Sequence, residues 1–288
     1  MKKVIFDIGY SATKYSIDGE RFILPSAVCS LGLSQIDSDS NAISMGGVNY
    51  LVGDKALRNH YPTRSYSALE RIAPLLVHKA LMDAKIDLDS EKLDVTIGLS
   101  LLNFKDKASQ YGERIKTTEV NGKALINSLA NNKLTIKPQG VSMNSQLQGL
   151  AIYIDIGFNT VDVIVVDDGA IVRDSCYANA NGTHKIVEQL QNYLIATYQL
   201  AITELLTNQY LHSGYVVVAG EKQSLTHIIE GLKHEYSFNL LASLEAKDFA
   251  LWQQADHIIF GGGGANLIEL PSQSNMRKAK DAEWVNVI

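Results

Sequence analysis

The sequence contains few of the residues that stabilise small secreted proteins. Cysteine occurs only twice, as Cys29 and Cys176, which lie far apart in a chain of 288 residues. A disulfide-rich scaffold is therefore excluded. We expect two free thiols, and a disulfide between them is the alternative.

Long hydrophobic runs are also missing. No stretch approaches the roughly 18 to 20 apolar residues of a membrane span. Residues 1–10 interrupt their apolar run at Asp7 and lack a cleavage site, so we expect a strand there rather than a leader. These features together predict a cytoplasmic protein without a membrane span.

Positive charge is not in surplus. The chain has 26 Lys and Arg residues against 31 Asp and Glu residues, a formal net charge of −5 at pH 7. Nucleic-acid-binding domains need a basic surface. We therefore expect no direct nucleic-acid binding, so that an adaptor protein would make any link to DNA.

Several catalytic signatures are absent. There is no Walker A sequence, no G-x-S-x-G elbow and no C-x-x-C pair. The seven histidines form no cluster with metal-ligand spacing. The missing Walker A sequence excludes a P-loop NTPase.

The sequence does contain one long-range repeat. Residues 7–11 read DIGYS and residues 155–159 read DIGFN. Each copy follows an apolar stretch and precedes a second β-prone run, which predicts a β-hairpin with a tight glycine turn. Two such hairpins indicate a duplicated domain, with one copy in each half.

Each hairpin has the composition of a phosphate-binding turn. A glycine turn lets backbone N–H groups point inward without an obstructing Cβ, and Ser11 and Thr13 add hydroxyl donors. Lys14 adds a mobile cation. A triphosphate would repel Asp7 and Asp155 unless a divalent cation intervened, so we predict that both hold a hydrated Mg²⁺. A single D-x-G would favour a plain turn after a strand, whereas the second copy favours phosphate binding.

A second glycine-rich segment lies near the C-terminus. An apolar strand at 257–260 runs into four glycines at 261–264. A glycine turn between a strand and a helix start lets a flat ring or a phosphate approach the backbone closely. The G-x-G-x-x-G spacing fails at Asn266, so this is not a dinucleotide fingerprint. A flexible loop is the alternative.

The remaining patterns indicate an α/β protein. Apolar spacing predicts a helix over 68–84, where Pro74 indicates a break or a late start. The other expected elements are helices at 183–198, 203–211 and 225–236, strands at 93–99 and 134–137, a buried strand at 215–219 and a hairpin over 47–53. Alternating strands and helices predict parallel sheets with helices on their faces.

The order of these motifs resembles the superfamily of actin, sugar kinases and heat-shock chaperone ATPases. Within it, the chain is most similar to the ParM-type bacterial and archaeal actin-like proteins. Residues 7–14 match the first phosphate motif, 155–162 the second, and 261–264 the adenosine motif. The other matching segments are 24–26 and 50–56 (small subdomain), 136–141 (first connecting segment) and 182–183 (second connecting turn).

The resemblance implies an α/β fold of duplicated actin-like, ribonuclease H-like domains, forming two lobes with a nucleotide cleft between them. Lobe I is expected over residues 1–150, with a small subdomain inserted at about 28–67. Lobe II is expected over 151–288, with a small subdomain at about 183–255.

The resemblance also implies cofactors and residue roles. The cofactors are ATP or ADP with Mg²⁺. Gln139 would orient the attacking water, since an amide is no general base at neutral pH. Asp155 and Asp162 are candidates for holding metal-bound water or polarising the nucleophile. The residues predicted to bind the nucleotide are Gly9, Tyr10, Ser11, Thr13, Lys14, Gly157, Phe158, Asn159, Thr160, Gly182, Lys185, Glu188, Gly261, Gly262, Gly263, Gly264 and Asn266.

The implied function is an actin-like ATPase whose hydrolysis is coupled to assembly with itself into filaments, for instance in plasmid DNA segregation. Two alternatives stay open. One is a nucleotide-binding adaptor that does not polymerise. The other is a small-molecule kinase of the same fold, which would need a carboxylate base beside its substrate. Residues 99–106 offer Asp106 for that role, without a recognisable pocket motif.

Overall fold

The computed structural model describes residues 1–31, 42–125, 132–139 and 147–286. These residues form two compact units. The first unit comprises residues 1–99 and 103–138, and the second comprises residues 100–102 and 139–286. The chain therefore enters the second unit briefly at residue 100 before it returns to it at residue 139.

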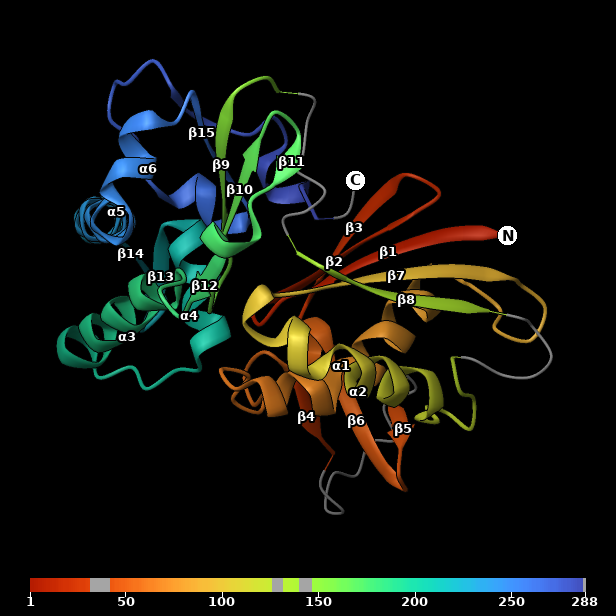
Figure 1. Ribbon diagram of the computed structural model, residues 1–288. Helices are drawn as coiled ribbons and strands as arrows, with labels where there is room; N and C mark the ends of the chain where they lie inside the picture. The colour runs from red at the N-terminus through yellow and green to blue at the C-terminus, as the bar shows by residue number, and fades with distance from the viewer. Residues whose placement is uncertain (32–41, 126–131, 140–146, 287–288) are drawn as a thin grey trace. The chain divides into compact units, whose positions relative to one another are not determined.

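The first unit contains a five-stranded sheet (Figure 1). Its strands, in spatial order, are β3 (Glu20–Pro25), β2 (Ala12–Ile17), β1 (Lys2–Ile8), β7 (Leu93–Leu99) and β8 (Lys133–Pro138). β1, β7 and β8 run parallel, whereas β2 and β3 are antiparallel to their neighbours. The sheet is therefore mixed, because the tight turns of the first hairpin reverse the chain direction.

The main sheet of the second unit has its strands in the same sequence of parallel and antiparallel directions. Its strands are β11 (Ala170–Ile171), β10 (Val161–Asp167), β9 (Leu150–Ile156), β15 (His257–Gly261) and β16 (Met276–Lys278), and β12 (Tyr177–Asn179) also pairs with β10. β9, β15 and β16 run parallel, and β10 is antiparallel to β9. The predicted duplication is thus present as two sheets of the same topology.

The helices predicted from apolar spacing are present in the structure. The six α-helices in the described residues are α1 (Tyr66–Asp83), α2 (Leu101–Thr117), α3 (His184–Tyr198), α4 (Glu204–Ser213), α5 (Thr226–Lys247) and α6 (Phe249–Gln254). α1 and α2 cover one face of the first sheet (Figure 1), and α3 packs against α4 and α5 in the second unit. α5 is longer than predicted because buried Leu240 and Leu244 continue its apolar face.

The predicted break at Pro74 is wrong, since α1 runs through it without interruption. Proline has no N–H to donate to the carbonyl four residues earlier, which here belongs to Glu70. The Nε of Arg114 on α2 donates to that carbonyl oxygen instead, at 3.0 Å. The neighbouring helix therefore satisfies the acceptor that proline leaves without its usual partner.

Two predictions about small strands need correction. The hairpin expected over 47–53 has its turn at Gly46 and Gly47, both at positive φ, so that β5 (Ile43–Met45) precedes the turn and β6 (Val48–Val52) is one strand. β6 also pairs with β4 (Val28–Ser30).

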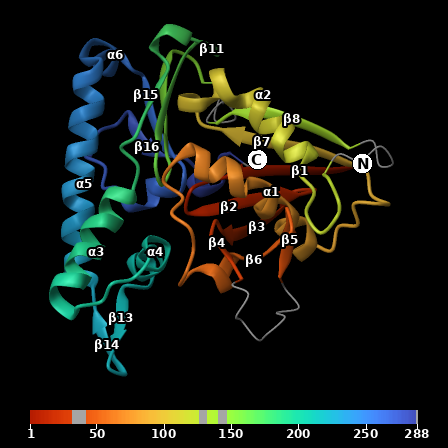
Figure 2. The same cartoon turned by 90° about the horizontal axis from the view of Figure 1, so that it is seen from below.

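The run at 215–219 is not a buried strand of the main sheet. Among the described strands, β13 (Tyr215–Val218) pairs only with β14 (Glu221–Ser224), in a hairpin that extends beyond α4 (Figure 2). Val216 is buried, but Val217 is 52% exposed. Its β-branched residues predicted a strand correctly, but composition alone did not show where that strand would pair.

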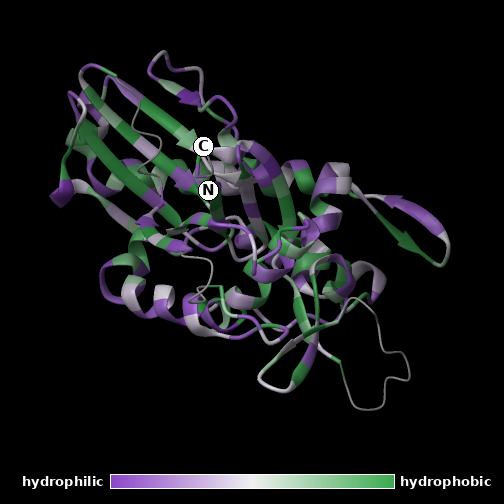
Figure 3. Cartoon of the chain, turned by 90° about the vertical axis from the view of Figure 1, so that its right-hand side faces the viewer, coloured by the Kyte–Doolittle hydropathy of each residue, from purple (hydrophilic) through white to green (hydrophobic). Residues whose placement is uncertain are grey.

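Each sheet has its own hydrophobic core. Figure 3 shows hydrophobic residues concentrated on the strands of the sheets. The first core joins side chains of β1, β7 and α1, including Phe6, Ile97 and Leu76. Both cysteines are free, and no described helix is long and apolar enough to cross a membrane.

Candidate functional site

The turn of the first hairpin is built around Gly9. Its N–H donates to the carbonyl oxygen of Ala12 at 3.1 Å. A Cβ at this position would lie 2.7 Å from the same oxygen, so a larger residue does not fit. This close approach explains why the repeat carries glycine here.

Neighbouring segments hold the carbonyl groups of this turn. Ser26 donates from Oγ to the carbonyl of Gly9 at 2.6 Å and from its backbone N–H to that of Ser11 at 3.0 Å. Thr63 donates from Oγ1 to the carbonyl of Tyr10 at 2.9 Å. Because Ser26 and Thr63 are themselves buried, the orientation of the turn is fixed from its outer side. Neither anchor was predicted as a site residue, although Ser26 lay in a segment matched to the family.

Two charged residues flank this turn on neighbouring strands. Asp7 of β1 is paired directly with Lys14 of β2, so both side chains lie on the same face of the sheet. Lys14 is only 8% exposed, and Asp7 is half-buried. A carboxylate and an ammonium group thus lie together beside the glycine turn.

The turn of the second hairpin has the same internal geometry. The N–H of Gly157 donates to the carbonyl oxygen of Thr160 at 2.8 Å, and a Cβ on Gly157 would lie 3.1 Å from that oxygen. Phe158, Asn159 and Thr160 complete the turn and are buried. The repeated sequence therefore gives the same turn in both units.

The start of α3 holds the carbonyl groups of this second turn. The backbone N–H groups of Gly182, Thr183 and His184 donate to the carbonyls of Asn159, Gly157 and Phe158, at 3.2, 3.1 and 2.8 Å. A Cβ on Gly182 would lie 2.2 Å from the oxygen of Phe158. The predicted connecting turn is thus in direct contact with the predicted phosphate turn.

The C-terminal glycine run lies against β9 and the start of α3. Gly262, at φ 81°, is so close to β9 that a Cβ would lie 2.3 Å from Oδ1 of Asp155. A Cβ on Gly264 would lie 2.3 Å from Cγ2 of Ile156 and 2.6 Å from Cγ2 of Thr183. The run leads into a short helix of the 3₁₀ type, Gly263–Leu267.

Asp155 lies at the centre of this arrangement and is 4% exposed. Its neighbours across the sheet are Gly261 on β15 and Asp162 on β10. The Nδ2 of Asn286 donates to its Oδ2 at 2.8 Å. Asn286 belongs to no predicted motif, and no local sequence signal identifies it.

Asp162 has a different environment. Its carboxylate is 1% exposed and accepts hydrogen bonds from Oγ of Ser100 and from the backbone N–H of Leu101, at the start of α2. A negative charge at this position also interacts favourably with the helix dipole. The structure thus gives Asp162 a contact that the sequence did not predict.

The other predicted residues are half-buried or exposed. Gln139 follows the end of β8 and is half-buried. Lys185 and Glu188 are exposed on α3, and Lys185 donates to Oδ1 of Asn181 at 2.6 Å. Asn266 is exposed in the 3₁₀-helix. Residues 140–141 of the first connecting segment lie outside the described residues.

The few carboxylates near the glycine turns suit a metal ion whose ligands are mainly water and phosphate oxygens. Within the described ranges, no group of three or more His, Cys, Asp or Glu residues is placed to hold a metal. Mg²⁺ in nucleotide sites usually keeps several waters and uses one or two carboxylates together with phosphate oxygens. Asp7 and Asp155 each lie beside a glycine turn of their own unit, and each suits the part of such a carboxylate.

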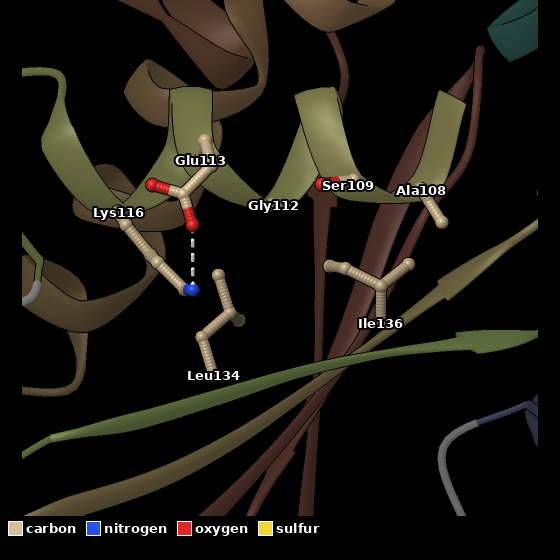
Figure 4. Close-up of a pocket in the computed structure, with 7 residues that line it drawn as sticks. All are labelled: Ala108, Ser109, Gly112, Glu113, Lys116, Leu134 and Ile136. Carbon is tan, nitrogen blue, oxygen red and sulfur yellow. Dashed lines mark hydrogen bonds and ion pairs between the residues drawn. The ribbon is translucent and has the colours of Figure 1, made fainter. Parts of the chain in front are cut away.

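One pocket in the first unit contains none of the predicted residues. It has a volume of about 230 Å³ and lies between α2 and β8 (Figure 4). Its lining residues are Ala108, Ser109, Gly112, Glu113, Lys116, Leu134 and Ile136. Lys116 and Glu113, both on α2, form an ion pair at 2.8 Å on one side of it. The pocket is smaller than the roughly 300 Å³ at which small-molecule sites begin.

The sequence matches two protein-family models. Residues 6–141 match the N-terminal domain of actin-like proteins, and residues 153–271 match the C-terminal domain of the MreB-like archaeal actin homologue. No curated protein matches the sequence.

Solved structures agree over almost the whole chain. Ta0583, an archaeal actin homologue, is 20% identical with a TM-score of 0.78, and a non-polymerisable quadruple mutant of pCBH ParM is 17% identical with a TM-score of 0.76. Each match covers 99% of this chain and 96% of the other. A 15-stranded ParM filament from Clostridium botulinum, 16% identical, covers the same shares with a TM-score of 0.76.

The chain therefore belongs to the actin-like superfamily, and ParM proteins and an archaeal actin homologue are among the proteins that share its fold.

Proposed function

We propose that the chain binds ATP and ADP with Mg²⁺, hydrolyses ATP and assembles with itself into filaments in a nucleotide-dependent way. The main support is the meeting of three glycine segments around Asp155 in the second unit. The second hairpin, the Gly182 turn and the run at 261–264 are far apart in sequence but lie within direct contact of one another.

The two hairpins supply the phosphate chemistry in this proposal. Glycine turns expose backbone N–H groups to an anion, and the fixed carbonyls of both turns keep their peptide planes in place. Lys14 adds a positive charge beside the first turn. Pre-organised donors of this kind bind a phosphate without a further ordering cost.

The carboxylates supply the metal site in this proposal. Asp7 and Asp155 hold the water shell of Mg²⁺, which neutralises the charge of the phosphates when it is bound. Gln139 orients the attacking water through its amide, since an amide does not take up a proton at neutral pH. Asp162 contributes through the start of α2, where its carboxylate accepts the hydrogen bonds of Ser100 and Leu101.

Proteins with the same fold support two further parts of the proposal, nucleotide binding and filament assembly. One structure of Ta0583 is a complex with ADP, 19% identical with a TM-score of 0.73, and the ParM of Clostridium botulinum forms a 15-stranded filament. The acidic net charge of this chain agrees with cargo attachment through an adaptor protein. Plasmid DNA is the cargo that we propose.

The proposal is tested by following assembly with light scattering and negative-stain microscopy in Mg-ATP and in Mg-ADP. We expect filaments whose amount depends on which nucleotide is present. Absence of assembly with either nucleotide, well above micromolar protein, contradicts the filament part of the proposal.

Hydrolysis is tested separately with Asp155→Ala, which we expect to abolish phosphate release. Asp167→Ala is the matched control, because Asp167 is exposed at the far end of β10. Unchanged turnover in Asp155→Ala removes Asp155 from the mechanism.

A further inference from the structure

The last described segment of the chain returns to the glycine run. After β16, the carbonyl of Ala282 accepts a hydrogen bond from the N–H of Gly262 at 2.7 Å. The N–H of Ala279 donates to the carbonyl of Phe260 at 2.8 Å. The segment from 279 to 282 is thus bonded to the backbone on both sides of Gly261.

The residue before Asn286 is anchored in the core. Val285 is buried in a cluster with Tyr153 of β9, Ile164 of β10 and Ile259 of β15. A buried valine fixes the backbone of the residue that follows it. The packing of Val285 therefore restrains the backbone next to Asn286.

From this position Asn286 contacts one atom of Asp155. A carboxylate is only an acceptor, so the amide presents its NH₂ group to Oδ2, at 2.8 Å. The other oxygen, Oδ1, lies against the backbone of Gly262, where a Cβ would be 2.3 Å away. The carboxylate is therefore held between the Asn286 amide on one side and a glycine on the other.

We propose that Asn286 is a positioning residue, which holds the Asp155 carboxylate in the orientation that binds hydrated Mg²⁺ with the nucleotide. This inference rests on the proposed function. Hydrogen-bond partners of metal-binding carboxylates set their orientation, and their loss lowers metal affinity about 10- to 100-fold. The contrasting possibility is that the amide occupies the oxygen that the metal needs, in which case its removal strengthens metal binding.

The experiment compares Asn286→Ala with Asn275→Ala. Asn275 is also half-buried in the second unit and donates from Nδ2 to a backbone carbonyl, that of Ala255, at 3.0 Å. Each variant thus loses an amide hydrogen bond, but only the first loses a bond to Asp155. Binding of a fluorescent ATP analogue is measured across a Mg²⁺ titration and in EDTA, with thermal unfolding as a check on folding.

We expect the apparent Mg²⁺ affinity of Asn286→Ala to fall about 10-fold or more, while its nucleotide affinity in EDTA and both affinities of Asn275→Ala change less than about 3-fold. Equal Mg²⁺ affinity in the two variants, or tighter Mg²⁺ binding in Asn286→Ala, overturns the inference. Failure of the unmodified chain to bind nucleotide overturns the proposed function, and the inference with it.

A crystal structure of the unmodified chain with Mg-ADP provides a second measurement that does not depend on a variant's folding. The inference expects Nδ2 of Asn286 to stay within hydrogen-bond distance of Oδ2 of Asp155 when the metal is bound. An amide displaced from that oxygen contradicts it.

Discussion

The hydroxyl of Ser100 donates to the carboxylate of Asp162, with Oγ 2.8 Å from Oδ1 and 3.0 Å from Oδ2. The two residues are 62 positions apart in sequence and both are buried. Ser100 is the first residue of the short segment 100–102, which belongs to the second unit, whereas the rest of α2 belongs to the first unit. The contact therefore attaches the start of α2 to β10.

This contact predicts a loss of stability when Asp162 is removed. Asp162→Ala leaves a buried hydroxyl and the N–H of Leu101 without their acceptor, so we expect the free energy of unfolding to fall by about 3 kcal/mol. Urea unfolding followed by circular dichroism measures it. Asp83→Ala, which loses an exposed ion pair with Lys79 on α1, should cost less than about 1 kcal/mol. A fully stable Asp162→Ala protein that has lost hydrolysis would contradict this role and favour direct catalysis.

His78 predicts a pH dependence of stability. Burial lowers the pKa of His78 from 6.5 to about 4. Above pH 6.5 the side chain is neutral in both states, but between pH 6.5 and 4 the unfolded chain takes up a proton that the folded chain does not. Stability is therefore lost as the pH falls through this window, by at most about 3 kcal/mol.

The test of this pH dependence is urea unfolding of His78→Leu between pH 4 and pH 7. We expect the variant to lose less stability than the unmodified chain on acidification. His227→Gln is the control, since it also removes one imidazole but at an exposed position on α5. Identical profiles for His78→Leu and the unmodified chain would show that His78 does not set the dependence.

The Gly182 turn predicts a position-specific effect of an added methyl group. Gly182→Ala places a Cβ 2.2 Å from the oxygen of Phe158, so α3 or the second hairpin must move. We expect a loss of about 2 kcal/mol or more in unfolding free energy and weaker nucleotide binding. Gly231→Ala adds its methyl to open space within α5 and should raise stability by about 0.5 to 1 kcal/mol. Equal effects of the two substitutions would contradict the close contact.

Lys14 predicts a difference between ATP and ADP. Lys14→Met keeps the side-chain stem but removes the charge opposite Asp7. We expect affinity for Mg-ATP to fall about 10-fold, because a charge-assisted hydrogen bond to the terminal phosphates is lost. Affinity for Mg-ADP should fall less, since ADP has one phosphate fewer. Fluorescence titration with both nucleotides measures this. Lys222→Met, on the hairpin of β13 and β14, is the control, and matching affinities in the two variants would place Lys14 outside the site.

The elements predicted correctly from sequence are those set by local patterns. The two hairpins follow from a glycine turn between β-prone runs, and α3 follows from its apolar spacing. α2 was not predicted, because its polar sequence buries only Tyr111, Gly112 and Ile115. A helix whose buried face is this narrow gives a weak periodic signal.

The parts of the site that sequence could not predict depend on tertiary contacts. The side chains of Ser26, Thr63 and Asn286 act through hydrogen bonds to residues 17, 53 and 131 positions away. The local sequence around a single serine, threonine or asparagine does not distinguish an anchoring residue from an ordinary residue on a polar surface. The glycines were easier to recognise, since a repeated D-x-G and a run of four are rare by chance.

The central claim is that the glycine hairpins bind an adenine nucleotide. Isothermal titration calorimetry with Mg-ADP measures this most directly, on the unmodified chain and on Gly157→Val, with Gly231→Ala as the control. We predict saturable binding of one nucleotide per chain, retained in Gly231→Ala and strongly weakened in Gly157→Val. No saturable binding to the folded, unmodified chain, or equal binding by Gly157→Val, would contradict the account.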